Sequence, residues 1–536
     1  MAIGTRLDLD STIERLLRKC KKDDKSLADL EKLEECFNIE RALGKTHHLP
    51  CGFGAWAEEK GKKMGVPFVF PEELARGKDV LRRESQRVVL QEPIPGIDLY
   101  QLRLTKQYEQ NYKKDAKSGV RKYVVGPLTG TAKVKVIMVV GATGSGKTTF
   151  INGIVNYIAG IEWEDRFRFR LNHEPETSNY QTESQTFWVI AYQLNWQPGF
   201  RTDYTLIIVD TPGYGNTRGI ERDHQITDQI REFFGDSRSR HSLVDHIDAI
   251  GFVVSNLQIC HTVSSTAHLV PSQKFVLDSI LSLFGKDMEK NISILATFCD
   301  AGPPAVKDAL IKDKVPFKII HKFNNSCIYG SNDDGEDEDA ALFNKMFWQM
   351  SMDGFDKFLS ALGKMRPKDL VMTRQVLTER QQIEMRVERI QKDVQKGLTL
   401  LDGLEQKMKL YRMGRTMALE EAIQAKADEF EKTQIDVLRM TEEIRTGLNR
   451  LKEIALKQDP MRHADSIQQL IEAEKIDHRP GWQKRVQQLE MSMRWARELE
   501  TITAADYNPF EKYITAESHG IMSKIISKDV KRMLGW

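Results

Sequence analysis

Long apolar runs are absent from this sequence. No stretch of the 536 residues approaches the roughly 18 consecutive apolar residues of a membrane-spanning helix, so we expect no transmembrane segment. The first residues, MAIGTRLDLDSTIERLL, lack the basic start and the apolar run of a signal peptide. Cysteine is scarce as well: the six cysteines are scattered and form no Cys-x-x-Cys pair, which predicts reduced thiols and no disulfide framework. Together these absences predict a cytoplasmic protein.

An excess of charge of one sign is also lacking. The 79 basic and 77 acidic side chains leave a net charge of +2, which argues against a dedicated nucleic-acid-binding protein. His47, His48 and Cys51 lie close together, but the second ligand pair of a structural zinc site is not nearby, so we interpret this segment as an ordinary loop. The acidic run NDDGEDEDAA lacks the ligand spacing of a calcium loop and is interpreted as a solvated loop.

The apolar pattern divides the chain into three regions. Residues 1–132 form a mixed α/β region to which we assign no function. In residues 133–367, apolar runs alternate with helical patterns, and strands are expected at VKVIMVV, FWVIAYQL, TLIIVD, AIGFVV, ISILATF and FNNSCIY. Near-continuous apolar strands separated by helices predict an α/β domain with a mostly parallel sheet and helices on both faces. A ligand would then bind at the carboxyl ends of the strands.

Residues 368–536 are highly charged and show helical periodicity. Apolar side chains recur at steps of three and four over residues 383–401 and again over residues 437–451. This spacing predicts an α-helical region of long helices packed as an antiparallel hairpin or a coiled coil. The breaks between helices are expected at Met413-Gly414 and at Asp459-Pro460.

The last residues, HGIMSKIISKDVKRMLGW, combine an apolar helical face with four basic side chains. This pattern is typical of an amphipathic helix, which either docks on its own protein or lies on a membrane surface. Docking on the protein is the preferred interpretation, and peripheral membrane contact is the alternative.

The most specific motif lies in the stretch VVGATGSGKTTF, between an apolar strand and the helical pattern TTFINGIVNYI. It matches the phosphate-loop pattern G-x-x-x-x-G-K-[ST]. Its glycines let successive backbone amides point at phosphate oxygens, and the following helix adds the positive end of its dipole. Lys147 would bridge the β- and γ-phosphates and Thr148 would coordinate magnesium. The residues expected to hold the phosphates are Gly141, Gly144, Ser145, Gly146, Lys147, Thr148 and Thr149.

The string TGSGKT does not select a base, since transporters and helicases carry it too, but the stretch TLIIVDTPGYG is more discriminating. It has the D-x-x-G arrangement, in which Asp210 would hold magnesium through a water and the Gly213 amide would sense the γ-phosphate. Motor ATPases more often place a glutamate directly after that aspartate, so Thr211 favours a GTPase. Thr186, directly before a strand, is our choice for the threonine that closes over magnesium and γ-phosphate, with Thr182 as the alternative.

The base-reading site is expected after the strand ISILATF. Thr297-Phe298-Cys299-Asp300 stands where GTPases place N/T-K-x-D, and Asp300 would accept hydrogen bonds from the guanine edge. Phe298 replaces the usual lysine, and its ring would stack on the purine. An ordinary helix-capping aspartate is the alternative for Asp300. In NNSCIY, Ser326 and Cys327 stand where a backbone amide often reaches the guanine oxygen.

In these motifs the chain resembles the septin-like branch of P-loop GTPases, which includes septins, the GTPases of immunity-associated proteins and chloroplast import receptors. The stretches VVGATGSGKTTFINGI and TLIIVDTPGYGNTRGIERD and the T-x-x-D pattern carry the resemblance over residues 133–330. It implies a P-loop NTPase fold, binding of GTP or GDP with Mg²⁺, slow hydrolysis and dimerisation across the nucleotide face. Tyr214 stands where small GTPases place a water-orienting glutamine, so hydrolysis is expected to need a residue supplied in trans. Arg218 and Arg222 are candidates for that role, or are surface residues of a mobile switch.

The leading functional hypothesis is a cytoplasmic, magnesium-dependent GTPase switch. Loops ordered by GTP would change how the helical region meets itself or a partner, in a homodimer or a higher oligomer. One alternative is a scaffold in which the nucleotide is a structural cofactor without turnover. The other is an ATP-driven mechanical P-loop ATPase.

Overall fold

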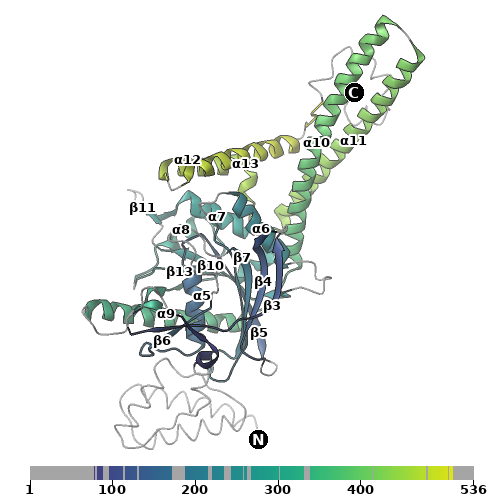
Figure 1. Ribbon diagram of the computed structural model, residues 1–536. Coiled ribbons are helices and arrows are strands. Elements are labelled where there is room, and N and C mark those ends of the chain that lie inside the picture. The colour runs from purple at the N-terminus through teal and green to yellow at the C-terminus, as the bar shows by residue number, and fades with distance from the viewer. Residues whose placement is uncertain are drawn as a thin grey trace, which may run out of the picture. The chain divides into compact units, whose positions relative to one another are not determined.

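The computed structural model describes residues 78, 81–88, 94, 96–112, 115–128, 132–171, 187–214, 220–234, 243–256, 259–261, 267–300, 302–330, 338–414, 416–478, 481–504 and 506–510. The chain divides into two compact units (Figure 1). Unit 1 comprises residues 1–216, 222–273 and 289–369, and unit 2 comprises residues 217–221, 274–288 and 370–536.

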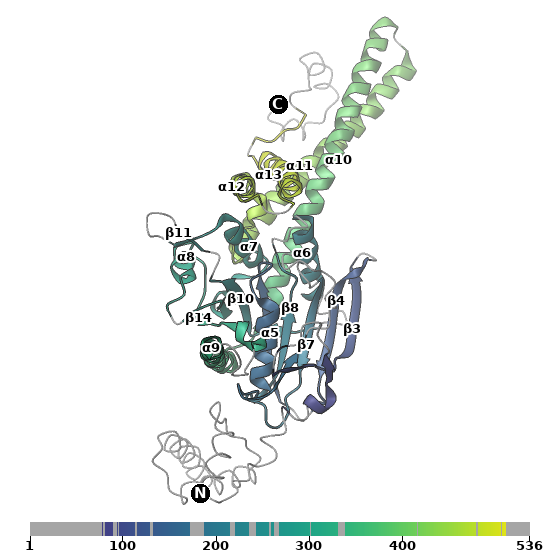
Figure 2. The same ribbon diagram turned by 60° about the vertical axis from the view of Figure 1, so that its left-hand side comes forward.

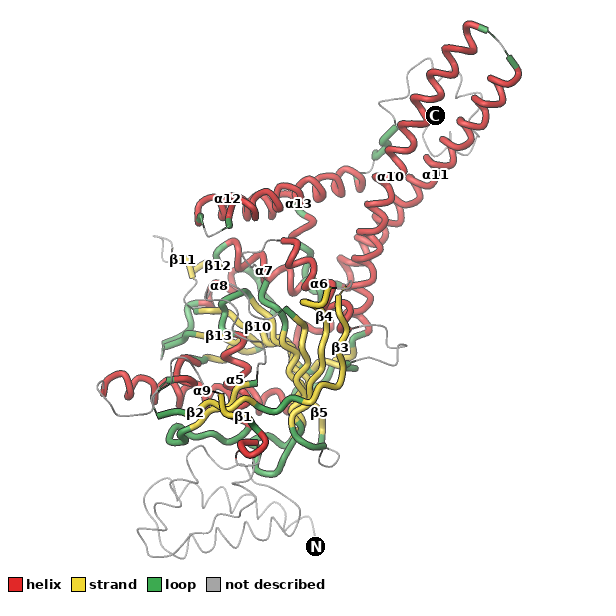
Figure 3. The backbone as a smooth tube through the Cα atoms, viewed as in Figure 1, coloured by secondary structure: helices red, strands yellow, loops and turns green. Residues whose placement is uncertain are grey.

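Unit 1 is built on an eight-stranded sheet. In spatial order its strands are β14 (Ile319–Lys322), β13 (Ile292–Thr297), β10 (Ala249–Ser255), β5 (Lys133–Gly141), β8 (Tyr204–Asp210), β7 (Trp188–Leu194), β4 (Asp115–Val125) and β3 (Thr105–Tyr112). The five strands from β14 to β8 run parallel to one another. β7 is antiparallel to β8, β4 is parallel to β7, and β3 is antiparallel to β4. The expected α/β architecture with a mostly parallel sheet is confirmed, and Figure 3 shows its strands in yellow.

The central strands are mostly apolar because both of their faces are covered. Successive side chains of a strand point to opposite faces, and every residue of β8 and β10 is buried. The described helices of this unit include α5 (Lys147–Ile158), most of α6 (Ile220–Phe234), α8 (Val306–Lys312), α9 (Glu338–Lys364) and the short 3₁₀ helix η2 (Asn325–Tyr329). Helices α5 and α9 share one hydrophobic core with the sheet, in which Phe150 packs against Phe323, Phe355 and Phe358.

The smaller sheets of unit 1 flank this framework. One pairs β1 (Gln86–Val88), β2 (Asp98–Gln101) and β6 (Phe167–Arg170), and two-stranded pairs join β11 (Ile259–His261) to β12 (Ala267–Leu269) and β9 (His246–Ile247) to β15 (Lys368–Asp369). Strands β3 and β4 lie before residue 132, so the sheet includes two strands from the region to which we assigned no function.

The expected strand at FNNSCIY is wrong. The strand at this edge of the sheet is β14, formed by the preceding residues IIHK, and NSCIY forms the 3₁₀ helix η2. The reason is the side chain of Asn324, whose Nδ2 donates to the carbonyl of Cys299 at 3.1 Å and whose Oδ1 accepts the Ser326 hydroxyl at 2.7 Å. Short polar side chains that bond locally favour turns over strands.

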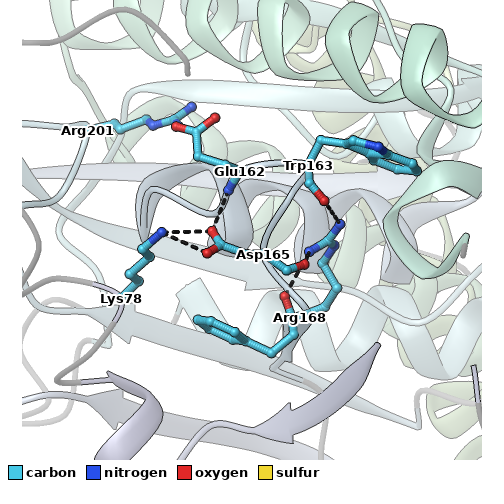
Figure 4. A network of polar contacts seen from close by, with 7 residues as sticks. Lys78, Glu162, Trp163, Asp165, Arg168 and Arg201 are labelled. Carbon is cyan, nitrogen blue, oxygen red and sulfur yellow. Dashed lines mark hydrogen bonds and ion pairs between the residues drawn. The ribbon is translucent and has the colours of Figure 1, made fainter. Parts of the chain in front are cut away.

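Arg168 holds together the segment that leads into β6 (Figure 4). Its guanidinium is buried and donates to the carbonyl oxygens of Trp163 at 3.1 Å, Asp165 at 2.6 Å and Phe167 at 2.9 Å. It lies 4.3 Å from the ring centroid of Trp348 on α9, and burial lowers the pKa of Arg168 to about 10. The Asp165 carboxylate accepts from Lys78 at 2.8 Å.

A buried ion pair stabilises the amino-terminal end of β5. Lys135 Nζ lies 2.8 Å from Asp248 Oδ1 and donates to the carbonyl of Met365 at 2.7 Å, while Asp248 Oδ2 accepts the Val136 amide at 2.8 Å. Burial disfavours the carboxylate, but hydrogen bonds from His246 and Lys135 outweigh it and hold the pKa of Asp248 below its usual value.

We expect Asp248→Asn to lower the free energy of unfolding of unit 1 by about 3–5 kcal/mol, because it leaves the Lys135 ammonium buried without its counter-charge. A carboxylate with a lowered pKa stabilises above its unfolded pKa and loses that contribution as pH falls through the folded pKa. The difference in the free energy of unfolding between wild type and Asp248→Asn should therefore have its full size at pH 7 and become smaller below about pH 4. Urea unfolding followed by tryptophan fluorescence measures it, with Asp245→Asn as the exposed control. Equal stability of the two variants would contradict the assignment.

Unit 2 is helical. It contains α10 (Val371–Met413), α11 (Met417–Ile454), α12 (Ala464–Asp477), α13 (Trp482–Thr503), the 3₁₀ helix η3 (Pro460–Arg462), most of α7 (Pro271–Leu281) and part of the 3₁₀ helix η1 (Lys286–Asn291). Helices α10 and α11 lie side by side in both views (Figures 1 and 2). Ion pairs join Arg450 to Glu379 and Lys396 to Glu429, so residues late in α11 meet residues early in α10.

The expected antiparallel hairpin and the break at Gly414 are thus confirmed. Its core is made of the predicted apolar positions, among them Ile383, Val387, Ile390, Val437 and Ile444. A second apolar cluster joins α7, α12 and α13 through Phe275, Ile467 and Leu489, and a buried Arg485–Glu474 pair at 2.6 Å links α12 to α13.

Candidate functional site

The glycine-rich loop (residues 141–149) connects the carboxyl end of β5 to α5. Gly141, Gly144 and Gly146 have φ values of 154°, 76° and 88°, a region that favours glycine. A Cβ on Gly141 would lie 2.4 Å from the carbonyl oxygen of Val253, so a side chain at this position would collide with the neighbouring strand β10. The three glycines identified from sequence are therefore required by the backbone conformation and, at Gly141, by close packing.

The Lys147 side chain folds back onto this loop. Its Nζ donates hydrogen bonds to the carbonyl oxygens of Gly141 at 3.0 Å and Ala142 at 2.8 Å. Burial lowers the pKa of Lys147 to about 8, while the negative charge of Asp210 opposes this shift. The first turn of α5 thus places a buried ammonium group beside a buried carboxylate.

The segment 210–214 is hydrogen-bonded to the glycine-rich loop and to the strand before it. β8 pairs with β5 so that Asp210 stands beside Val139, and Thr211 Oγ1 donates to the Val139 carbonyl at 2.9 Å. The Thr143 amide donates to the Tyr214 carbonyl at 2.9 Å, which brings the two motifs together. A Cβ on Gly213 would lie 2.6 Å from Thr143 Oγ1, so this second glycine is also required by close packing.

The segment 297–300 begins at the carboxyl end of β13 and contacts the glycine-rich loop. The Thr297 hydroxyl donates to the Ser145 carbonyl at 2.7 Å. Phe298 has a φ of 54°, an unusual value for a large residue, and the residue is 39 % exposed. A Cβ on Gly146 would lie 3.5 Å from the Phe298 ring, so this aromatic ring stands next to the loop.

Asn324 connects Ser326 to the segment that carries Asp300. The exposed Asp300 carboxylate accepts the Gly302 amide at 3.0 Å through Oδ1. Asn324 bonds both the Cys299 carbonyl and the Ser326 hydroxyl, so η2 is tied to the segment that carries Asp300. Burial raises the pKa of Cys299 to about 11 and of Cys327 to about 12, which keeps both as neutral thiols at pH 7.

Most of the residues predicted from sequence therefore meet at one end of the sheet, at the carboxyl ends of β5, β8 and β13. Thr182, Thr186 and Arg218 lie outside the described residues, and so does the side chain of Arg222. Tyr214 is buried, with its hydroxyl 3.5 Å from Thr227 Oγ1. Among the described residues, no group of three or more His, Cys, Asp or Glu side chains is arranged to hold a metal ion.

Sequence reasoning missed Thr143 and Asn324. The Thr143 hydroxyl is buried between the two motifs and has no hydrogen-bond partner within the described part of the chain, while its amide bonds Tyr214. Thr143 occupies one of the variable positions of the glycine-rich pattern, so no motif singles it out. Asn324 could have been recognised, because an Asn-Asn-Ser run is a turn signal.

None of the helices in the described ranges has a stretch long and apolar enough to cross a bilayer. The tail 519–536 and the segment with His47, His48 and Cys51 fall outside those ranges. No protein-family model matches the chain, and no curated protein matches it.

Proposed function

We propose that unit 1 is a P-loop GTPase domain that binds GTP or GDP with Mg²⁺ and hydrolyses GTP slowly in the cytoplasm. The supporting observation is that the glycine-rich loop is hydrogen-bonded both to Tyr214, directly after the segment 210–213, and to Thr297 of the segment 297–300, at the carboxyl edge of a mostly parallel sheet. This is the edge at which ligands bind in open α/β sheets.

The residues present fit a magnesium-bound nucleoside triphosphate. Lys147 holds a buried positive charge that matches a polyphosphate, and the backbone amides of the glycine-rich loop are the donors that phosphates accept. The Thr148 hydroxyl and the Asp210 carboxylate supply the oxygen ligands that Mg²⁺ prefers, and Thr186 is proposed as a third. Bound magnesium would neutralise charge on the phosphates.

The base would be read at the exposed end of the site. Asp300 offers a carboxylate to the two N–H donors of guanine, and Ser326 lies on the element tied to that segment. The exposed Phe298 ring beside the loop would stack on the purine in the role of the usual lysine stem.

A scaffold that holds its nucleotide without turnover is the second candidate function. It is favoured by Tyr214, whose buried side chain at the position after D-x-x-G has no carboxamide to orient an attacking water. Single-turnover assays separate the two candidates: the GTPase releases phosphate from bound GTP, and the scaffold releases none. In either case the hairpin of unit 2 is proposed to mediate dimerisation or assembly.

The test of this proposal is the nucleotide carried by freshly purified protein. Heat-denatured protein should release GDP or GTP, separated by anion-exchange chromatography, in near-stoichiometric amount, and Lys147→Ala protein should release none. Adenine nucleotides would instead favour the ATP-driven alternative. Protein that carries no nucleotide and binds none in the presence of Mg²⁺ would overturn the proposal.

A further inference from the structure

Unit 2 contains a cavity of about 400 Å³, within the size range of small-molecule sites. Its walls come from the last three turns of α11, from the segment 457–463 around η3, and from the end of α13, with Arg380 of α10. All of these elements belong to the helical unit, so the cavity is separate from the proposed nucleotide site.

Cationic side chains outnumber carboxylates in the walls. The two carboxylates are Asp459 and Glu500, and the five cationic side chains are Arg380, Arg445, Lys452, Lys457 and Arg462. Lys457 has a partner in Asp278 at 3.5 Å, and Arg445 pairs with Glu442 at 3.2 Å. Arg380 and Arg462 pair with Asp459, and Arg462 Nη2 also lies 4.0 Å from Glu384 Oε1, so within the described residues Lys452 is the wall cation that has no carboxylate partner.

The two buried guanidinium groups share one carboxylate. Arg380 is 4 % exposed and Arg462 is 7 % exposed. Arg380 Nη1 lies 2.5 Å from Asp459 Oδ2, and Arg462 Nε lies 3.6 Å from the same oxygen. The Nε of Arg380 is buried and has no hydrogen-bond partner among the described residues. Burying a cationic group with an unused hydrogen-bond donor costs free energy of folding. An oxyanion bound in the cavity would accept a hydrogen bond from this donor and reduce that cost.

The remaining wall is apolar. Leu448, Leu451 and Ala455 contribute from α11 and the residue that follows it, and Leu499 contributes from α13. A bare inorganic anion would leave this surface in contact with water, whereas a ligand with a short apolar part would cover it. The cavity therefore combines the two kinds of surface that recognise an amphipathic anion.

We propose that this cavity binds a small amphipathic organic anion, whose carboxylate or phosphate group meets Arg380 and Arg462 and whose apolar part lies against Leu448, Leu451 and Leu499. The bound ligand would contact three helices at once, because Arg380 belongs to α10 and the apolar wall belongs to α11 and α13. The site makes unit 2 a ligand-binding module as well as a structural one.

The experiment is calorimetric titration of the full chain with octanoate, octyl phosphate and neutral octanol. The protein carries Lys147→Ala, so that phosphate binding at the glycine-rich loop is not counted. We expect one molecule of octanoate or octyl phosphate to bind per chain and octanol to bind at least about tenfold more weakly, because it cannot make charge-assisted hydrogen bonds. The tighter of the two anions identifies the preferred head group.

Two further variants keep the proposal falsifiable. Lys452→Glu changes an exposed side chain of the cavity wall, so the fold is retained, and it should weaken anion binding at least about tenfold by repulsion. Lys432→Glu makes the same change on an exposed face of α11 outside the cavity and should leave binding unchanged. Equal binding of octanol and the anions, equal effects of the two variants, or no binding of any of the three compounds would overturn the proposal.

Discussion

Replacing Lys147 by alanine is expected to weaken GTP binding at least about 100-fold, or about 3 kcal/mol. The Lys147 ammonium is the only formal positive charge within residues 141–149, and each charge-assisted hydrogen bond that it would make to phosphate contributes about 1.5–3 kcal/mol. Titration of a fluorescent GTP analogue with and without Mg²⁺ measures the loss.

The control for this experiment is Lys307→Ala, which removes an exposed lysine from α8 in the same unit. It should bind the analogue as tightly as wild type. Circular dichroism of Lys147→Ala should match wild type, because the substitution removes hydrogen bonds to only two loop carbonyls. A folded Lys147→Ala protein that retains full affinity would show that the nucleotide site lies elsewhere.

The same lysine should make GTP affinity depend on pH. Since burial lowers the pKa of Lys147 to about 8, the contribution of Lys147 to GTP affinity should be constant below pH 8 and fall by up to about tenfold per pH unit above it. Stability without nucleotide should move in the opposite direction. Between pH 8 and the ordinary lysine pKa of 10.5 the unfolded chain binds more protons than the folded one, so this contribution to stability rises with pH. Lys147→Ala should abolish both dependences.

The apolar pattern predicted the central strands because burial on both faces leaves a continuous signal. VKVIMVV, TLIIVD and AIGFVV each fall within an observed strand. The hairpin was predictable for a similar reason, since its core is formed by positions three and four residues apart. In both cases the prediction depends on local sequence, because the apolar pattern within one segment shows which of its faces are buried.

Elements that depend on distant partners were not predictable in this way. β3 reads TKQYEQNY, with no apolar face, and is held in the sheet by its antiparallel pairing with β4. In NSCIY the apolar residues suggested a strand, but the bonds made by Asn324 decide the conformation. The geometry of the candidate site also depends on contacts between residues that are distant in the sequence. Spacing identified the glycine-rich loop and Asp210, whereas the bonds from Thr143 to Tyr214 and from Thr297 to Ser145 link segments more than 70 residues apart.

Asp300→Asn is expected to change which base unit 1 binds. Guanine presents two donors, its N1–H and its 2-amino group, and the Asp300 carboxylate accepts from both in the proposed complex. The amide of the variant has one acceptor and one donor, so one hydrogen bond is lost and the guanine amino group faces another donor. Loss of a bond to a charged group and an unpaired donor together cost about 3 kcal/mol, which lowers GTP affinity about 100-fold.

The same substitution should improve the fit of other bases. Xanthine replaces the 2-amino donor by a carbonyl acceptor, and it therefore matches an amide that offers one acceptor and one donor. Xanthosine triphosphate should bind Asp300→Asn more tightly than wild type, and competition against the fluorescent GTP analogue measures the preference for xanthosine, guanosine and adenosine triphosphates. The loop is expected to keep its shape, because the amide oxygen still accepts the Gly302 amide as Oδ1 does in the native chain.

Asp308→Asn, an exposed change in the first turn of α8, is the matched control and should leave the order of preference unaltered. An unchanged preference in Asp300→Asn, with Lys147→Ala still abolishing binding, would show that phosphate recognition is correctly placed and base recognition is not. Asp300 would then be a turn-forming residue whose carboxylate serves Gly302 alone. Because the two substitutions act on opposite ends of one nucleotide, their results separate a purine-selective GTPase from a site that reads only the triphosphate.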